Sequence, residues 1–153
     1  MRRIIALSLV IAFVLAVSGC GIIGDDPSPT LTEFRNELIR GRETAIKDLF
    51  VVPASIEAEI FNCPEEEAFT FKTDLEDHFG ELFDQIDFLD ITIEGIDTVE
   101  DGDDSALITA TWHVKWDDGE EKTDSWETAF GLVKVGGGLL QRGEWKIKSI
   151  IFE

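Results

Sequence analysis

The chain has 153 residues, enough for one domain, and 44% of them are apolar, which excludes a disordered protein. Acidic residues number 32 and basic residues 13, so the net charge is -19. Binding to nucleic acid needs clustered Lys and Arg, and no such cluster occurs after residue 3. The composition therefore argues against nucleic acid as a partner.

The first nineteen residues have the pattern of an export signal. Arg2 and Arg3 precede the apolar run 4–17, and small residues lead up to Cys20. The segment 17–20, Val-Ser-Gly-Cys, resembles the lipobox of bacterial lipoproteins, in which the cysteine becomes the new N-terminus and carries acyl chains. The resemblance implies a signal peptide over 1–19 and a protein of the cell envelope, held outside the cytoplasm by lipid on Cys20.

Two alternatives stay open for this segment. An ordinary signal peptide could be cut nearby, or the uncharged run 4–23 could span a membrane as an uncut helix. Gly19, Gly21 and Gly24 disfavour that helix. Residues 1–19 contain two bases and no acid, so the chain from Cys20 onward carries a net charge of about -21. This charge opposes binding to anionic lipid, so acyl chains would have to hold the protein on the membrane. It would also suit a salty habitat, which composition alone does not decide.

Two Gly and two Pro in 21–29 predict that residues 20–29 form a tether and that one domain fills 30–153. Thr30 and Glu33 fit a capping box at the start of a helix. Apolar residues at helical spacing continue through a bend at Gly41 into a second short helix. Pro53 predicts that this second helix ends near Val52.

Cys63 is followed by Pro64 and three glutamates, a sequence typical of a helix start. An apolar stripe from Ala68 to Ile86 predicts that this third helix runs to about residue 86. The apolar period then changes to 2, which predicts strands around 90–99, 108–116, 126–132 and 145–151, with a hairpin at Asp118-Gly119. Helices followed by hairpin-linked strands indicate an α+β fold with a mainly antiparallel sheet. Its inner row comprises Ile91, Ile93, Ile96, Trp112, Trp116, Trp126, Thr128, Phe130, Leu132, Trp145, Ile147 and Ile151.

This order of elements resembles the NTF2-like superfamily, in which N-terminal helices pack on a curved antiparallel sheet wrapped into a cone. The resemblance covers 30–153. Residues 143–147, Gly-Glu-Trp-Lys-Ile, are similar to the final strand of many members, and 38–42 resemble their helix-to-helix turn. A cystatin-like arrangement of one helix and four strands is the nearest alternative. The superfamily includes both enzymes and non-enzymes, so the fold alone does not decide the function.

Relatives often pair through the open face of the sheet, which implies a weak homodimer for this chain. We expect that face to present Leu107, Thr109, Thr111, Val133, Ile150 and Phe152.

Catalytic chemistry is poorly supported by the residues. Ketosteroid isomerase activity needs a tyrosine in its oxyanion hole, dehydratase relatives also use tyrosine, and this chain has none. His78 could act as a base if Asp74 or Asp77 oriented it, but a histidine that only forms a hydrogen bond at the surface is the simpler interpretation. His113 falls on the predicted outer face of the sheet and is expected to be solvated.

Metal binding is also disfavoured. Two separate histidines and one free cysteine do not make a zinc set, and the acids at 101–104 lack the Gly and Glu that a calcium loop requires. Cys63 is expected to be a small, partly buried apolar residue. We therefore predict no metal site and no cofactor.

Four Trp and eleven Phe are many for this length. Core packing accounts for most of them, yet a cone lined by Trp112, Trp126, Phe130 and Trp145, with His78 near its mouth, would suit an apolar ligand. The sequence thus predicts a non-catalytic module that binds a small apolar ligand or an envelope protein. The alternative is an isomerase- or dehydratase-like enzyme acting on a small hydrophobic substrate.

Overall fold

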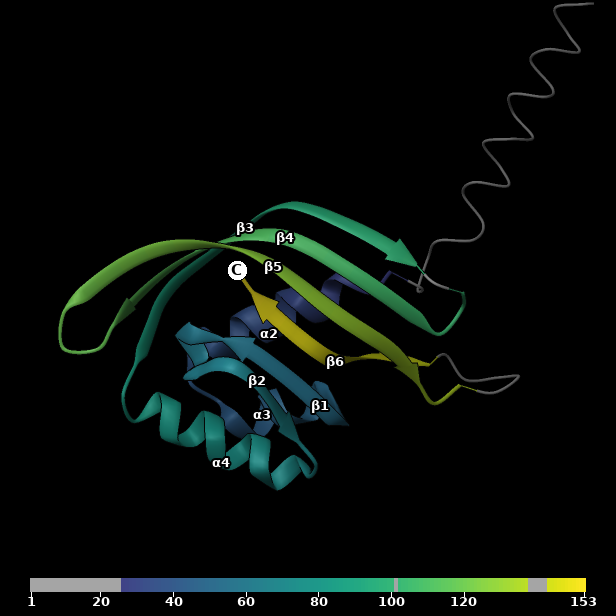
Figure 1. Cartoon of the computed structure of the whole chain (residues 1–153), viewed down its shortest axis with the longest axis horizontal. Helices are drawn as coiled ribbons and strands as arrows, with labels where there is room; N and C mark the ends of the chain where they lie inside the picture. Colours follow the sequence, from purple (N-terminus) through teal and green to yellow (C-terminus); the bar gives the residue numbers. More distant parts are fainter. Residues whose placement is uncertain (1–25, 101, 138–142) are drawn as a thin grey trace, which may run out of the picture.

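Residues 26–100, 102–137 and 143–153 are described by the computed structural model of the chain (Figure 1). The lipobox and Cys20 lie outside these residues, as do Asp101 and Gly138. No helix in the described part is both long and apolar enough to cross a membrane. The elements, in chain order, are α2 (Ser28–Arg40), α3 (Glu43–Asp48), β1 (Phe50–Ala58), the 3-10 helix η1 (Glu59–Phe61), β2 (Cys63–Phe69), α4 (Lys72–Phe83), β3 (Asp87–Glu100), β4 (Ser105–Asp117), β5 (Glu121–Val135) and β6 (Glu144–Phe152).

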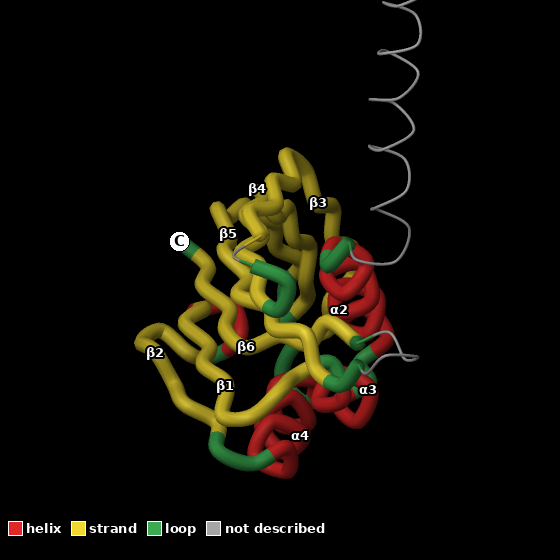
Figure 2. Tube along the Cα trace, turned by 90° about the vertical axis from the view of Figure 1, so that its right-hand side faces the viewer, coloured by secondary structure: helices red, strands yellow, loops and turns green. Residues whose placement is uncertain are grey.

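The six strands form one curved sheet in the order β2-β1-β6-β5-β4-β3. The β1–β6 pair is parallel and the other pairs are antiparallel. Strands β3, β4 and β5 arch over α2 (Figure 1), and the three helices gather on one side of the sheet (Figure 2). The predicted α+β class, with helices on a curved and mainly antiparallel sheet, is confirmed.

One phenylalanine occupies the centre of the core. The Phe34 ring, on α2, contacts five other aromatic rings at centroid distances between 5.8 and 6.1 Å. Edge-to-face ring contacts of this kind add to the stabilisation from apolar burial. Helix, strand and 3-10 segments therefore meet on a single side chain. The contacting rings belong to Phe50, Phe61, Phe79, Trp112 and Phe130.

The first helix begins earlier than predicted. It starts at Ser28, whose backbone N–H donates to Asp26 at 2.9 Å, and Pro29 suits the first turn because it lacks an N–H. The Thr30–Glu33 capping box is wrong: Thr30 is buried, and its hydroxyl lies 3.4 Å from the Trp145 carbonyl. The two last residues of the predicted tether are thus helical.

The predicted bend at Gly41 is confirmed. Gly41 has a φ of 61°, and the N–H groups of Gly41 and Arg42 donate to the Leu38 and Glu37 carbonyls, which forms a Schellman motif. The second helix ends at Asp48 rather than near Val52. Pro53 does not terminate it but lies within β1, where the pairing with β6 shifts register and the missing N–H costs no ladder hydrogen bond.

The predicted helix start at Cys63 is wrong. Residues 63–69 form the edge strand β2, antiparallel to β1, and α4 begins only at Lys72, where Asp74 accepts a hydrogen bond from the Phe71 N–H at 3.2 Å. Pro64 is tolerated because edge strands leave some N–H positions unpaired. Pairing with β1 overrides the local helix signal of the glutamates.

Two β-bulges change which residues face inward. In β3, Gly95 and Ile96 lie opposite Ala110 between the pairs Glu94–Thr111 and Asp97–Thr109, and Ile96 is exposed rather than on the inner face with Ile91 and Ile93. In β6, the register shift at Lys148 adds one residue to the strand and reverses which of the following side chains face inward. Ile151 is therefore exposed rather than on the inner face with Trp145.

Because of the β6 bulge, two of the residues predicted for the dimer face do not lie on it. Ile150 and Phe152 are buried in the core, while Leu107 and Ile151 are exposed, as are Ile96 and Val99 on β3. Pairing of two copies through this face stays a prediction, now with a different set of residues.

Candidate functional site

The proposed aromatic pocket is filled by its own side chains. Trp112 and Phe130 stack at 5.3 Å and have no surface accessible to water, so no space large enough for a water molecule touches either ring. Their predicted inward orientation is confirmed. Within the described residues, the Trp112 indole N–H is buried and has no hydrogen-bond partner, which leaves one uncompensated polar group in the apolar core.

The remaining candidate residues lie apart from one another. Trp126 is partly buried and contacts Trp116 at 5.7 Å. Trp145 is partly buried beside Thr30 and Leu49, with the Lys134 ammonium 5.6 Å from its ring. His78 projects from α4 toward η1 and β2. The five predicted residues therefore do not line one common cavity.

Trp126 lines an open cleft with an apolar floor and an acidic rim. The cleft holds ≈ 360 Å³ and includes the paired indoles of Trp116 and Trp126. A hydrogen bond from Lys122 lowers the pKa of Asp118, so this rim carboxylate stays ionised well below neutral pH. Indole faces attract cations, and the Glu59 and Asp124 carboxylates add to that attraction, whereas the charge of Asp118 is compensated by Lys122. The lining residues are Glu59, Ile60, Asn62, Ile86, Trp116, Asp118, Asp124 and Trp126.

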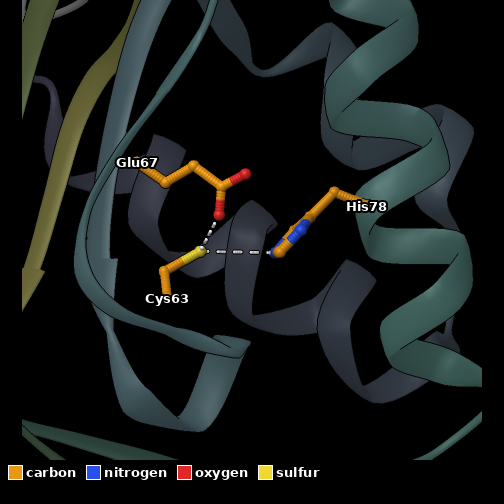
Figure 3. Close-up of side chains that lie close together, drawn as sticks. All are labelled: Cys63, Glu67 and His78. Carbon is orange, nitrogen blue, oxygen red and sulfur yellow. Dashed lines mark hydrogen bonds between the residues drawn. The ribbon is translucent and has the colours of Figure 1, made fainter.

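A second group of polar side chains lies between β2 and α4 (Figure 3). The Cys63 Sγ is 3.5 Å from both the Glu67 Oε2 and the His78 Nε2. The His78 Nε2 is also 2.8 Å from the Phe61 carbonyl oxygen. Because a carbonyl only accepts hydrogen bonds, Nε2 carries a proton and donates it to Phe61. Asp74 and Asp77, the predicted partners of His78, do not contact it; Asp74 caps α4 instead.

The Cys63 thiol is protonated in this environment. Burial, reinforced by the Glu67 carboxylate, raises its pKa to about 12. A protonated thiol is a poor nucleophile, and the His78 nitrogen nearest to it holds its own proton. The pair therefore lacks the arrangement of a cysteine–histidine nucleophile. The prediction that Cys63 is a buried residue is confirmed.

The sequence pattern of Cys63 and that of His78 were interpreted separately, and neither predicted that the two side chains lie close together. The obstacle was the single helix predicted from Cys63 to about residue 86, which would have placed His78 roughly 22 Å further along the same helix. In a strand, residues four apart share a face, so Cys63 and Glu67 point the same way. His113 lies on the outer face as predicted, with its Nδ1 2.6 Å from the Ser125 hydroxyl.

No known family model and no curated protein matches the chain. Solved structures do resemble it. An NTF2-like protein of unknown function in nutrient uptake from Rhodospirillum rubrum is 14% identical, with a TM-score of 0.66 over 84% of this chain and 98% of that one. A ketosteroid isomerase-like protein from Erwinia carotovora is 16% identical, with a TM-score of 0.65 over 82% and 90%. A candidate dehydratase of the NTF2-like family from Streptomyces avermitilis is 15% identical, with a TM-score of 0.62 over 82% and 90%.

These likenesses define the class of fold: helices held within a curved, cone-like sheet. The domain has the NTF2-like fold, as its order of elements predicted. At these identities the likeness extends to the fold and not to an activity.

Proposed function

We propose that this chain is a lipoprotein of the cell envelope whose NTF2-like domain is a non-catalytic interaction module. The lipobox at 17–20 and the Gly- and Pro-rich residues after Cys20 support attachment to a membrane through acyl chains. Two or more acyl chains give stable attachment, whereas a single chain gives marginal binding.

The filled interior supports a role without catalysis. In this fold a substrate would enter the cone, and here Phe34, Trp112 and Phe130 occupy that space with no exposed surface. The chain also contains no tyrosine for an oxyanion hole, so the activities named for its structural neighbours are not carried over. Turnover of a small hydrophobic substrate that disappears in His78→Ala would overturn this part of the proposal.

The cleft at Trp116 and Trp126 is the binding surface that the geometry favours. It is open, its floor is aromatic, and its rim contributes the carboxylates of Glu59, Asp118 and Asp124. Such a surface suits a partner that combines an apolar group with a positive charge. We infer that the module recognises a segment of an envelope protein with apolar and basic side chains.

A peptide titration tests this inference. The full chain is titrated in detergent with a short peptide of Leu, Phe and Lys, and with the same peptide carrying Glu in place of Lys. We expect the basic peptide to bind and Trp126→Ala to weaken binding roughly tenfold, since a cation over an indole contributes about 1–2 kcal/mol.

The matched control is Trp145→Ala, which removes a partly buried indole outside the cleft and leaves the net charge unchanged. It should bind the basic peptide like the unmodified chain. If both tryptophan variants bind equally well, attraction to the acidic surface in general explains the binding and the cleft proposal is wrong.

A further inference from the structure

We propose that Cys63, Glu67 and His78 form a binding site for a zinc-class divalent cation that joins β2 to α4. The inference does not rest on the proposed function, because none of these three side chains lines the Trp116–Trp126 cleft. It rests on the separation of the donor atoms, on their chemical type and on the elements that carry them (Figure 3).

The two separations from the Cys63 sulfur match those of a tetrahedral site. With metal–sulfur bonds of ~2.3 Å and metal–nitrogen or metal–oxygen bonds of ~2.0–2.1 Å, neighbouring ligand atoms of tetrahedral zinc lie roughly 3.3–3.6 Å apart. The Cys63 Sγ lies 3.5 Å from the His78 Nε2 and 3.5 Å from the Glu67 Oε2. All three donor atoms fall within 4.8 Å of one another.

A fourth donor adjoins the three side chains. The Phe61 carbonyl oxygen is 3.6 Å from the Cys63 Sγ and accepts the hydrogen bond from His78. When a cation binds, the His78 ring changes tautomer, so that Nδ1 carries the proton and the Nε2 lone pair faces the metal, while the Cys63 thiol releases its proton to solvent and binds as a thiolate. Phe61 or a water molecule then completes the coordination.

The donor types select the class of metal. One thiolate, one imidazole and one carboxylate suit Zn²⁺ and its neighbours among the transition metals, whereas Ca²⁺ and Mg²⁺ prefer oxygen donors throughout. Without a cation, the neutral Cys63 thiol donates a hydrogen bond to the Glu67 carboxylate at 3.5 Å. Once the thiol has lost its proton, a bound cation would neutralise the two anionic donors. The metal explains why a carboxylate, a sulfur and an imidazole converge here better than packing alone does.

The elements position the donors independently of any metal. Pairing with β1 aligns Cys63 with Ala58 and Glu67 with Ile56, which fixes both residues on the edge strand. Ring contacts with Phe69 and Phe79 hold the His78 imidazole. A bound ion would therefore link the edge strand β2 to the neighbouring helix α4.

Cobalt titration tests the site with a spectroscopic signal. The full chain carrying Cys20→Ala, so that Cys63 is its only cysteine, is purified in detergent, stripped with a chelator and titrated with Co²⁺. We expect a thiolate-to-cobalt charge-transfer band in the near ultraviolet, intense visible bands of tetrahedral cobalt, and loss of both when Zn²⁺ is added. Zn²⁺ should also raise the melting temperature, because it binds only the folded site.

Variants separate this site from adventitious binding to the acidic surface. Cys63→Ser should abolish the charge-transfer band, and Glu67→Gln should weaken Zn²⁺ binding at least tenfold. His113→Gln is the matched control, since His113 also has a carboxylate nearby, that of Glu94 at 3.5 Å, and should bind like the parent chain. Circular dichroism of each variant confirms folding. Absence of the charge-transfer band in the folded parent, or an equal Zn²⁺-induced shift in melting temperature with and without Cys63, would overturn the proposal.

Discussion

Glu37 offers a quantitative test of how the turn between α2 and α3 is held. Its side chain is only 6% exposed and accepts hydrogen bonds from Arg42 at 2.5 and 2.7 Å and from Arg40 at 3.0 Å. Arg40 is the last residue of α2 and Arg42 follows the turn at Gly41, so the carboxylate ties the Schellman turn to the helix that it terminates. We expect Glu37→Gln to lose the charge on the acceptor and at least one of the three bonds.

The size of the expected loss in stability depends on how exposed the two arginine side chains are. A hydrogen bond to a charged group contributes about 1.5–3 kcal/mol. Both arginine side chains are more than half exposed, so water replaces part of what the substitution removes. We therefore expect a net loss of about 2 kcal/mol at pH 7, which corresponds to a fall of roughly 5–10 °C in the melting temperature for a domain of this size.

The loss should depend on pH in a defined direction. The hydrogen bond from Arg42 lowers the pKa of Glu37 below its usual value of 4.5, against the opposing effect of burial. The folded-state pKa is thus below the unfolded one, so the stabilisation is complete above about pH 5 and is lost as the pH falls through the folded-state pKa. Glu37→Gln should be less stable than the parent at pH 7, and the difference should shrink as the pH falls below 4.5.

Urea unfolding of the full chain at pH 7, 5 and 3.5 measures this difference. Glu33→Gln, an exposed acid one turn earlier on α2, is the control and should change stability by less than about 0.5 kcal/mol at each pH. A difference between Glu37→Gln and the parent that stays constant from pH 7 to 3.5 would refute the reasoning.

Two further predictions follow from the sequence and the sheet. Cys20→Ala should release the protein from membranes or leave it uncut, as followed by cell fractionation and mass spectrometry; unchanged maturation and membrane partition would refute the lipid anchor. Gly131→Ala should destabilise the domain by about 1–3 kcal/mol in urea unfolding, because the new Cβ would lie 2.4 Å from the Ser149 Oγ. Ser149→Ala in the same chain should recover most of that loss, since the nearest remaining side-chain atom is then at 3.7 Å; no recovery would contradict the steric explanation.

The elements that the sequence predicted well are those in which local pattern and tertiary environment agree. Inward-facing and outward-facing residues alternate along β4 and along the second half of β5. Trp112 and Phe130 are buried, as this alternation predicted. Gly41 marked a helix end because its left-handed conformation favours glycine in any context.

The errors arose where distant pairing overrides local preference. Residues 63–69 have no local pattern typical of a strand; they form one because they pair with β1. Strand β1 itself was not predicted, because Pro53 was interpreted as the end of a helix. A bulge adds one residue to a strand and reverses the parity after it, which is why Ile151 was assigned to the wrong face. The same missed strand hid the Cys63 cluster, since its three side chains come from two elements whose contact depends on that pairing.

The placement of β6 bears on how the protein is made. This strand comes last in the sheet's sequence order yet lies between β1 and β5, and its pairing with β1 joins residues almost a hundred positions apart, Phe50 with Ile147. Until β6 has been synthesised, the β1–β2 hairpin has no neighbour through which to join the rest of the sheet. Long-range pairing of this kind slows folding and prolongs the exposure of unpaired edges. A nascent chain that stalls before β6 would therefore present β1 and β5 to chaperones or to other chains, and the sheet closes only after β6 has been synthesised.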